Sequence, residues 1–535
     1  MSEPLTTSEP ASSPGRKGRT AGIVGVLTVC VSVVGYLREA TLAARFGISS
    51  TMDAYFAAIF IPTILYVVLI VGTLSPIFIP ILIQEDPEKR PANASMTFSV
   101  VTNFVMLVMI VIVALGVFGA HQWLPWLFPG FAPATDAMAL RLVYIIFPAL
   151  PLLGAAGILI ALLNGFHKFW LAAFSPAFAS LSVIAAALLA RGDRAVYTVG
   201  IATAAGFILQ FVVLVPAAWS LGIRYRAALD FRHPAIAKLL RLGIPLFLYL
   251  VVANASFVLE RSLASRISAG AVATLTYAFR LFTVPANFLA APLAIVAYPG
   301  FAREAAREQR GDLTSQSVRL FHLVVFLFLP VTLWMMLNAG FITRLLYEHG
   351  RFMASDSLVT SRILVIYSLG ILPNAVSTVL LRCLFAIEDM VTPLVAELFD
   401  LGFFSVAALY LAKHFGLEGL VVARSMSFFV VMAILAAVLA RKKLLRFDGE
   451  LLRLFIFTSL ATIAMGAVSW SSMRLFQPVF ETGPTLLRLV LVCTGLALSA
   501  GTFLTAARLL RLSQTRQIVN TAREMMPGAG NRGVD

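Results

Sequence analysis

Apolar runs of 18 or more residues recur along the whole of this 535-residue chain, and they constrain its fold more than any other feature. A run of that length with few charges can cross the hydrocarbon core of a bilayer as an α-helix. Hydrophobic residues make up 60% of the chain and charged residues 13%, about half the share that soluble domains carry. No long stretch alternates as the strands of an outer-membrane barrel do. The sequence therefore predicts an all-α polytopic membrane protein.

We expect about fourteen transmembrane helices, with boundaries good to a few residues. They cover 21–46, 52–84, 95–120, 137–163, 169–190, 195–221, 242–266, 270–299, 317–341, 357–387, 392–413, 418–440, 451–473 and 484–510. The N-terminal segment 1–20 is polar and lacks the cleavage pattern of a signal peptide, so we expect a disordered tail there.

The net charge of +15 is distributed as the positive-inside rule describes. If the N-terminus is cytoplasmic, the tails and even-numbered connections carry most of the Lys and Arg residues, such as Lys89 and Arg224, and the opposite side carries few. We therefore expect both termini in the cytoplasm and no nucleic-acid partner. For the basic connection "RYRAALDFRHPAIAKLLR", binding of anionic lipid headgroups is a second interpretation.

The two halves of the chain resemble each other. When the chain is shifted against itself, three pairs align at nearly the same offset: Pro62 with Pro285, Pro76 with Pro299, and Arg141 with Arg362. Chance similarity competes with duplication here, because any two membrane helices look alike. With six spans per half, both halves would begin on the same side of the membrane. A duplication therefore gives two parallel six-helix lobes, which is a transporter architecture.

The expected organisation follows from the spans and the repeat. It comprises a cytoplasmic tail (1–20), an N-lobe with helices 1–6 (21–222), a basic cytoplasmic connection (223–241), a C-lobe with helices 7–12 (242–440), an extra C-terminal helix pair (451–510) and a cytoplasmic tail (511–535). No filter-like pore segment of a channel interrupts these spans.

No motif of catalysis, nucleotide binding or metal binding appears in the chain. The three cysteines, Cys30, Cys383 and Cys493, lie far apart in apolar runs, and the six histidines show no ligand spacing. The outer connections are short and hold no acid–base set, so an intramembrane glycosyltransferase or polymerase is the weakest interpretation. We expect neither an enzyme nor a cofactor.

Charged residues inside the predicted spans are the candidate functional residues, since each costs about 2.5–3.5 kcal/mol or more at the bilayer centre unless it finds a partner. Arg38 and Glu39 lie in the first span, Asp53 opens the second, and Arg280 lies in the eighth. Further charges at such positions are Glu260, Arg261, Arg266, Arg362, Arg382 and Arg424.

Two interpretations of these charges are open. One is buried ion pairs that fix helix packing, or, near span ends, side chains that reach the interface. The other is that Arg38 and Arg280, one from each half, face a shared wet cavity and bind a diphosphate. Guanidinium groups suit this role because each can bind two phosphate oxygens at once.

Glu397 and Asp400 are three positions apart in the predicted eleventh span, so they share one helix face. Two carboxylates at that spacing could hold a cation or share a proton, as a coupling pair. Pairing with Arg424 on the next helix is an equally weighted alternative.

Several segments, taken in order, resemble one family. They are "SVVGYLREATLAARFGISSTMDAYFAAIFIPTIL" (32–65), "LFPGF" (127–131), "LLNGFHKF" (162–169), "YAFRLFTVP" (277–285), "LLYEHGRF" (345–352) and "EDMVTP" (388–393). They resemble the MurJ/MviN lipid II flippases of the multidrug/oligosaccharidyl-lipid/polysaccharide (MOP) exporter superfamily, over about residues 21–510.

The resemblance implies fourteen helices in two lobes around a central cavity. It implies that the chain moves an undecaprenyl-diphosphate-linked peptidoglycan precursor to the outer leaflet of the bacterial inner membrane by alternating access. Arg38, Glu39, Asp53 and Arg280 match the positions of the family's substrate-binding residues. The implied partners are this lipid-linked glycan, membrane lipids and proteins of cell-wall or polysaccharide assembly.

The chain also departs from the family pattern. Val33 and Tyr66 stand where the family has arginines, Thr63 where it has Asn and Phe279 where it has an acidic residue, and the family's cation-site positions fall near Phe404 and Ala408. The cavity is therefore expected to be less basic than in a typical member. This leaves three functions open: a lipid II flippase, a flippase for a lipid-linked exopolysaccharide or O-antigen unit, and a non-transporting scaffold.

Overall fold

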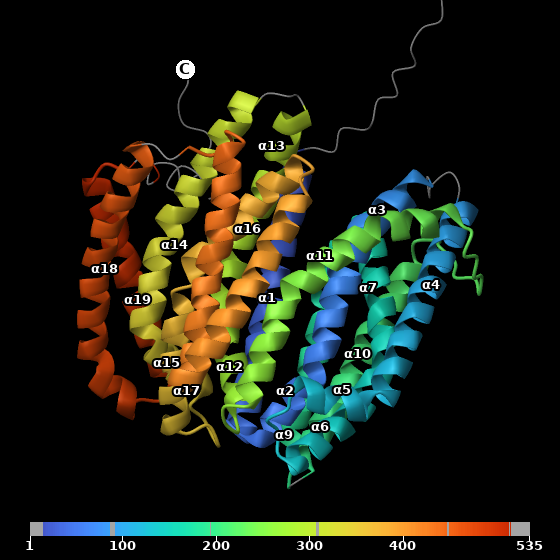
Figure 1. The fold of residues 1–535 in the computed structure, drawn as a ribbon, viewed down its shortest axis with the longest axis horizontal. Coiled ribbons are helices and arrows are strands. Elements are labelled where there is room, and N and C mark those ends of the chain that lie inside the picture. The colour runs from blue at the N-terminus through green and yellow to red at the C-terminus, as the bar shows by residue number, and fades with distance from the viewer. Residues whose placement is uncertain are drawn as a thin grey trace, which may run out of the picture. The chain divides into compact units, whose positions relative to one another are not determined.

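The computed structural model describes residues 14–85, 91–192, 194–306, 310–446, 449–512 and 514 (Figure 1). These residues are almost entirely helical and contain no strand. The predicted tails lie outside the described residues, except for 14–20, where the first helix begins, and for 511, 512 and 514.

The chain forms two compact units. Among the described residues, unit 1 holds those up to Leu42, Ala57–Trp123 and Ala137–Leu248; unit 2 holds Ala43–Phe56, Leu124–Asp136 and those from Tyr249 onward. Unit 2 therefore includes two short segments that the sequence assigns to the N-lobe. The lobes themselves remain a prediction.

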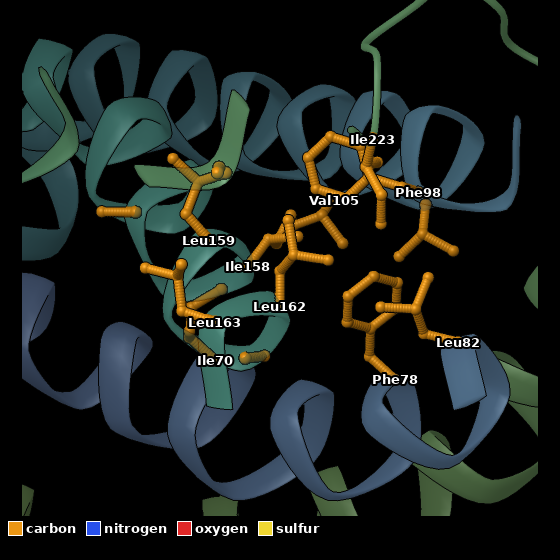
Figure 2. Packing of buried hydrophobic residues seen from close by; sticks show 14 of the residues in the cluster. Ile70, Phe78, Leu82, Phe98, Val105, Ile158, Leu159, Leu162, Leu163 and Ile223 are labelled. Carbon is orange, nitrogen blue, oxygen red and sulfur yellow. The ribbon is translucent and has the colours of Figure 1, made fainter. Parts of the chain in front are cut away.

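Unit 1 contains, in whole or in part, the helices of the first half. These are α1 (Pro14–Phe46), α2 (Ser50–Leu65), the π-helix η1 (Tyr66–Leu74), α3 (Ser75–Gln84), α4 (Pro91–Phe118), α5 (Ala120–Leu127), α6 (Pro133–Ile146), the 3₁₀ turn η2 (Phe147–Ala149), α7 (Leu150–Gly165), α8 (Phe169–Phe174), α9 (Pro176–Leu189), α10 (Ala195–Trp219) and the start of α11 (Pro234–Ser265). Helix α7 is central, since α3, α4 and α10 all contact it. Its Ile158 and Leu162 pack with Phe78 and Phe98 in a buried apolar cluster (Figure 2).

Unit 2 contains the rest of α11 and the helices that follow. These are α12 (Ala271–Pro285), the π-helix η3 (Ala286–Ala290), α13 (Ala291–Ala306), α14 (Arg310–Tyr347), α15 (Ala354–Ser368), α16 (Ile371–Ala386), α17 (Val391–Arg441), α18 (Gly449–Thr482) and α19 (Thr485–Leu509). Helices α18 and α19, which cover the range of the predicted C-terminal pair, contact each other and α14 (Figure 1). Phe326 of α14, Met465 of α18 and Phe503 of α19 are buried in this contact.

Each π-helix lies just after a proline. Pro62 lies inside α2 shortly before η1, and Pro285 is the last residue of α12, directly before η3. A proline removes an N–H donor and its ring clashes with the carbonyl one turn earlier, so the helix must deform locally. These two prolines are one of the pairs that align when the halves of the sequence are compared. Both halves of the sequence thus carry the same local distortion.

Helix α17 reverses direction at Gly416. As one straight helix its 51 residues would extend about 75 Å. Gly416 instead has non-helical backbone angles (φ 57°, ψ −135°), and an ion pair of 3.1 Å between Lys442 Nζ and Asp389 Oδ2 joins the two ends of the element. The two arms correspond to the predicted spans 392–413 and 418–440.

The number of spans stays open. Among the described residues, eleven helices are long and apolar enough to cross a membrane, or twelve if the pair α15 and α16, bent by 45°, forms one span. That number counts α17 once and omits α12 and α13, which cover the predicted eighth span. The prediction of an all-helical polytopic membrane protein is confirmed, whereas the number fourteen is not established.

Candidate functional site

Arg38 and Glu39 form an ion pair near the end of α1. The distance from Arg38 Nη2 to Glu39 Oε1 is 2.6 Å, and the side chains are 23% and 5% exposed. Consecutive residues of a helix point in different directions, so the long arginine side chain must bend back to reach its neighbour. Glu39 therefore holds the Arg38 guanidinium while the Arg38 side chain stays partly accessible.

Asp53 caps the N-terminus of α12. Its carboxylate accepts hydrogen bonds from the backbone N–H groups of Gly270 (2.5 Å) and Ala273 (2.8 Å). The first turn of a helix leaves such donors without an intrahelical partner and favours a negative charge there. Asp53 is buried, so these contacts give it a structural role within unit 2. The sequence predicts a substrate-binding residue at this position, and a helix cap is the contact that the structure shows.

Arg280 lies in the second half of α12 and is half-buried. It belongs to unit 2, whereas Arg38 belongs to unit 1. That the two arginines face a shared cavity remains a prediction.

Asp53 is part of a larger junction inside unit 2. We define the junction as the contacts of Ala44–Asp53 with Gly270–Ala273 and with Gly350–Arg351, and of Gly130 with Ser265. The Arg351 N–H donates to the Ala44 carbonyl at 2.7 Å, and the Gly130 N–H donates to Ser265 Oγ at 3.4 Å. These contacts join segments that lie far apart in the chain.

Glycines allow the backbones of the junction to approach closely. A Cβ atom added at Gly130 would lie 2.1 Å from the Ser265 carbonyl oxygen, and one at Gly350 would lie 2.3 Å from that of Ala44. At Gly270, which also has a φ of +83°, it would lie 2.4 Å from a methyl group of Ile48. No side chain fits at Gly130 or Gly350 without displacing the backbone, and one at Gly270 would displace the Ile48 side chain and strain a positive-φ backbone. Gly130 and Gly350 belong to the motifs "LFPGF" and "LLYEHGRF", so the junction gives a physical reason for both.

A second group of charges is fully buried in unit 2. We call Glu260, Arg261, Asp400 and Arg424 the ionic cluster; the first two come from α11 and the last two from the two arms of α17. Arg424 lies at its centre, with Nε 3.4 Å from Glu260 Oε2 and Nη1 3.6 Å from Asp400 Oδ2. Arg261 Nη1 lies 3.7 Å from the same Glu260 oxygen. Two carboxylates and two guanidinium groups neutralise each other, which permits their burial.

Neutral side chains complete the ionic cluster. Tyr367 donates a hydrogen bond of 2.6 Å to Glu260, Arg424 donates to Ser256 at 3.1 Å, and Ser427 donates to Asp400. The Arg424 guanidinium lies 3.8 Å from the centre of the Phe404 ring, a cation–π contact.

These neutral partners were not predicted from the sequence. Ser256 precedes Glu260 by four positions and Ser427 follows Arg424 by three, so helical spacing could have indicated both. No signal in the sequence marks Tyr367, because it comes from a helix elsewhere in the chain.

Glu397 and Asp400 differ in their surroundings. Asp400 is 4% exposed and engaged by Arg424 and Ser427, the alternative that the sequence left open. Glu397 is half-buried and interacts electrostatically with Asp400, Arg424 and Tyr249. The part of the chain that the structure describes contains no group of three or more His, Cys, Asp or Glu side chains that could hold a metal ion. A coupling role of the pair remains a prediction.

Residues 42–491 match the family model of the lipid II flippase MurJ. The chain belongs to this family. A MurJ family member of Vibrio cholerae, named a probable lipid II flippase, is 28% identical over 426 residues, which cover 77% of this chain and 81% of the relative. The match to the family model includes Asp53, Arg280, Glu397 and Asp400, and it begins shortly after Glu39.

Solved structures show the same fold as this MurJ family member. One described as lipid II flippase MurJ in an inward closed conformation has a TM-score of 0.76 at 22% identity and covers 91% of this chain and 99% of that chain. An inward-facing multidrug resistance MATE transporter of the MOP superfamily has a TM-score of 0.65 at 13% identity, covering 78% and 98%. The family inferred from the sequence motifs is confirmed. The chain is therefore a multi-pass membrane protein of transporter fold.

Proposed function

We propose that this protein is a flippase rather than an enzyme, and that it moves an undecaprenyl-diphosphate-linked glycan resembling lipid II to the outer leaflet of the bacterial inner membrane. The observation that carries this proposal is the family match over residues 42–491, with relatives named lipid II flippases along most of that length. The absence of a catalytic motif in the sequence fits transport, since flipping breaks no covalent bond.

Arg38 and Arg280 would bind the diphosphate. The Arg38 side chain is 23% exposed, so an incoming phosphate oxygen can approach it while Glu39 still neutralises its charge. Exchange of the Glu39 carboxylate for phosphate keeps a counter-ion beside the guanidinium throughout, which avoids an unpaired charge in the membrane. The guanidinium also offers two parallel N–H donors to two oxygens, which an ammonium group cannot do.

The junction would close the outer side of the pathway. Under the predicted topology, the connections near residues 47–51, 121–136, 267–269 and 342–356 all lie on the outer side, and these contribute the junction contacts. Alternating access requires that such a contact forms in one state and separates in the other. The junction would therefore keep the protein open to the cytoplasm.

Glu397 would respond to the driving ion, while Asp400 holds Arg424. This assignment rests on their surroundings, because Asp400 is already paired with the guanidinium of Arg424. Glu397→Gln should change how transport depends on pH or on an ion gradient. Unaltered dependence on both would leave Glu397 as a packing residue.

A flippase for a lipid-linked exopolysaccharide or O-antigen unit is the second candidate. The specific observation in its favour is that Val33 and Tyr66 replace two arginines of the family pattern. Tyr66 is half-buried and hydrogen-bonded to Gln210, so it adds no positive charge for a diphosphate.

Complementation of a bacterial strain depleted of its own lipid II flippase tests the proposal. The wild-type chain should restore growth, Arg38→Ala and Arg280→Ala should each abolish rescue at equal expression, and the Arg→Lys variants should rescue only partly. Leu37→Ala, which removes an exposed apolar side chain beside Arg38, is the matched control and should rescue fully. Rescue of a polysaccharide-export mutant alone would favour the second candidate. Full rescue by the Arg38→Ala, Arg280→Ala double variant would exclude the proposed role of the arginines.

A further inference from the structure

A short extended segment of unit 1, which we call the strap (residues 224–228), lies along α4. Ser95, Ser99 and Asn103 follow each other at intervals of four, so they share one face of α4. Ser95 Oγ accepts from the Arg224 N–H at 3.1 Å, Ser99 Oγ accepts from the Arg226 N–H at 2.9 Å, and Asn103 Nδ2 donates to the Ala228 carbonyl at 2.7 Å. The backbone of the strap is therefore held to α4 at three points.

An apolar cavity of about 270 Å³ lies beside the strap. Phe98, Leu159, Leu162 and Ile223, four of the residues labelled in Figure 2, contribute to its wall. The cavity is about nine times the roughly 30 Å³ that one water molecule occupies in the liquid, which is room for part of a lipid chain. Thr102, Asn103, Trp219 and Tyr225 supply polar side-chain atoms to its lining, and the other nine lining residues are apolar.

The rim of the cavity combines aromatic and basic side chains. Trp219 and Tyr225 line it and are 68% and 53% exposed, as is typical of aromatic residues at a membrane–water interface. Tyr225 OH donates to Asn103 Oδ1 at 2.6 Å, which fixes the ring over the cavity mouth. Arg224 and Arg226, on either side of Tyr225, are exposed. Basic groups above an apolar space between membrane helices are the arrangement that binds anionic lipid headgroups.

We propose that this cavity holds an acyl chain of an anionic membrane phospholipid, whose phosphate group is bound by Arg224 and Arg226. The charge complementarity of the rim selects an anionic lipid, and the predicted cytoplasmic location of the 223–241 connection places the rim at the more anionic leaflet. The lipid-linked glycan is the weaker occupant, because the cavity offers no polar chamber for a sugar. Only residues 229–233 separate the strap from α11, so a bound lipid would also stabilise the start of that helix.

Binding of phosphatidylglycerol to delipidated, purified full-length protein tests the proposal, with phosphatidylcholine of the same acyl chains as the comparison. Native mass spectrometry or a titration in detergent measures both affinities. Phosphatidylglycerol should bind more tightly, and Arg224→Gln with Arg226→Gln should weaken it about tenfold. Arg191→Gln with Arg194→Gln removes the same charge from exposed positions elsewhere in unit 1 and should change nothing.

A second variant tests the cavity apart from the charges. Thr102→Phe enlarges a side chain of the cavity wall, leaves the basic rim intact and should exclude the acyl chain, so the affinity for phosphatidylglycerol should fall although both arginines are present. Equal affinity for the two lipids in the wild type, or an unchanged affinity in both the arginine and Thr102→Phe variants, would overturn the proposal. So would competition by a lipid-linked diphosphate for these same residues, which would assign the cavity to the transported substrate.

Discussion

At the scale of single residues, two arginines in apolar helices show opposite surroundings. Arg424 is 1% exposed, lies between two carboxylates and stacks on Phe404. Arg38 is 23% exposed and paired with the adjacent Glu39. Only an arginine whose side chain is partly accessible can exchange its partner for a ligand. Burial therefore separates an arginine that stabilises the fold from one that is suited to bind substrate.

The ionic cluster predicts a large cost for losing Arg424. Arg424→Met would leave Glu260 and Asp400 buried without their shared cation, and removal of one partner of a buried pair costs about 3–5 kcal/mol. The stability of Arg424→Lys should lie between that of the wild type and that of Arg424→Met, because an ammonium group cannot reach both carboxylates and stack on a ring. Thermal unfolding in detergent measures this.

The control is the triple variant Arg424→Met, Glu260→Gln, Asp400→Asn, which removes the charges together and should recover much of the lost stability. Wild-type stability of Arg424→Met alone would contradict a stabilising role of the ionic cluster.

The sequence identified the charged residues but not their partners. A charge in an apolar span predicts burial with a counter-charge, and this located Glu260, Asp400 and Arg424. Which of them pair depends on how distant helices pack. Asp53 shows the same limit, because the N–H groups that it binds belong to the start of α12, far along the chain, and the sequence therefore suggested a substrate role.

At the scale of elements, the glycines of the family motifs act by allowing backbones to touch. At Gly47, in the first of these motifs, a Cβ atom would lie 2.7 Å from the Arg351 carbonyl oxygen. The partner segment could not be predicted, since a glycine carries no signal about what approaches it.

The junction predicts that a cross-link across it stops transport. After replacement of Cys30, Cys383 and Cys493, the variants Ala44→Cys and Arg351→Cys would place thiols on segments whose backbones share a hydrogen bond of 2.7 Å. Cross-linking should abolish flipping, and cleavage of the link should restore it, because the junction could no longer separate. A liposome flipping assay measures this.

The matched control is a cross-link between Thr314→Cys and Lys443→Cys. These residues are in contact within unit 2, with 2.9 Å between Thr314 Oγ1 and the Lys443 carbonyl oxygen. That link should be tolerated. Continued flipping by the cross-linked Ala44–Arg351 pair would exclude the junction as a gate.

The two ends of α17 predict a pH-dependent contribution to stability. Burial raises the pKa of the Asp389 carboxyl, but hydrogen bonds from the Thr392 side chain (2.6 Å) and backbone (2.9 Å) and the ion pair with Lys442 outweigh it and lower the pKa below its ordinary value. A lowered pKa means that the stabilisation is present at neutral pH and is lost as the pH falls below about 4.

Asp389→Asn should therefore reduce the free energy of unfolding at pH 7 by up to about 1 kcal/mol and by less near pH 3. Thermal unfolding of wild type and variant at both pH values measures the difference. An equal loss at the two pH values would show that the carboxylate charge does not contribute.

At the scale of the whole molecule, the sequence predicted the class of fold well. Bilayer thickness sets the length of each apolar run, so helices appear where hydropathy indicates them. The predicted number of spans is harder to test, because hydropathy does not describe a helix that bends, as between α15 and α16, or one that reverses, as at Gly416. Such breaks depend on tertiary packing.

The last prediction concerns orientation in the membrane. Lys and Arg residues concentrate in the tails and even-numbered connections, which motivates cytoplasmic termini and an outer location for residues 126–134. In a chain without its native cysteines, Trp126→Cys should react with a membrane-impermeant maleimide added to intact cells, because Trp126 is 79% exposed. Arg232→Cys, also exposed but in the basic connection, should react only after permeabilisation. Labelling in the reverse pattern would invert the topology; the junction would then face the cytoplasm, and the strap would face the outer leaflet, where anionic lipid is scarcer.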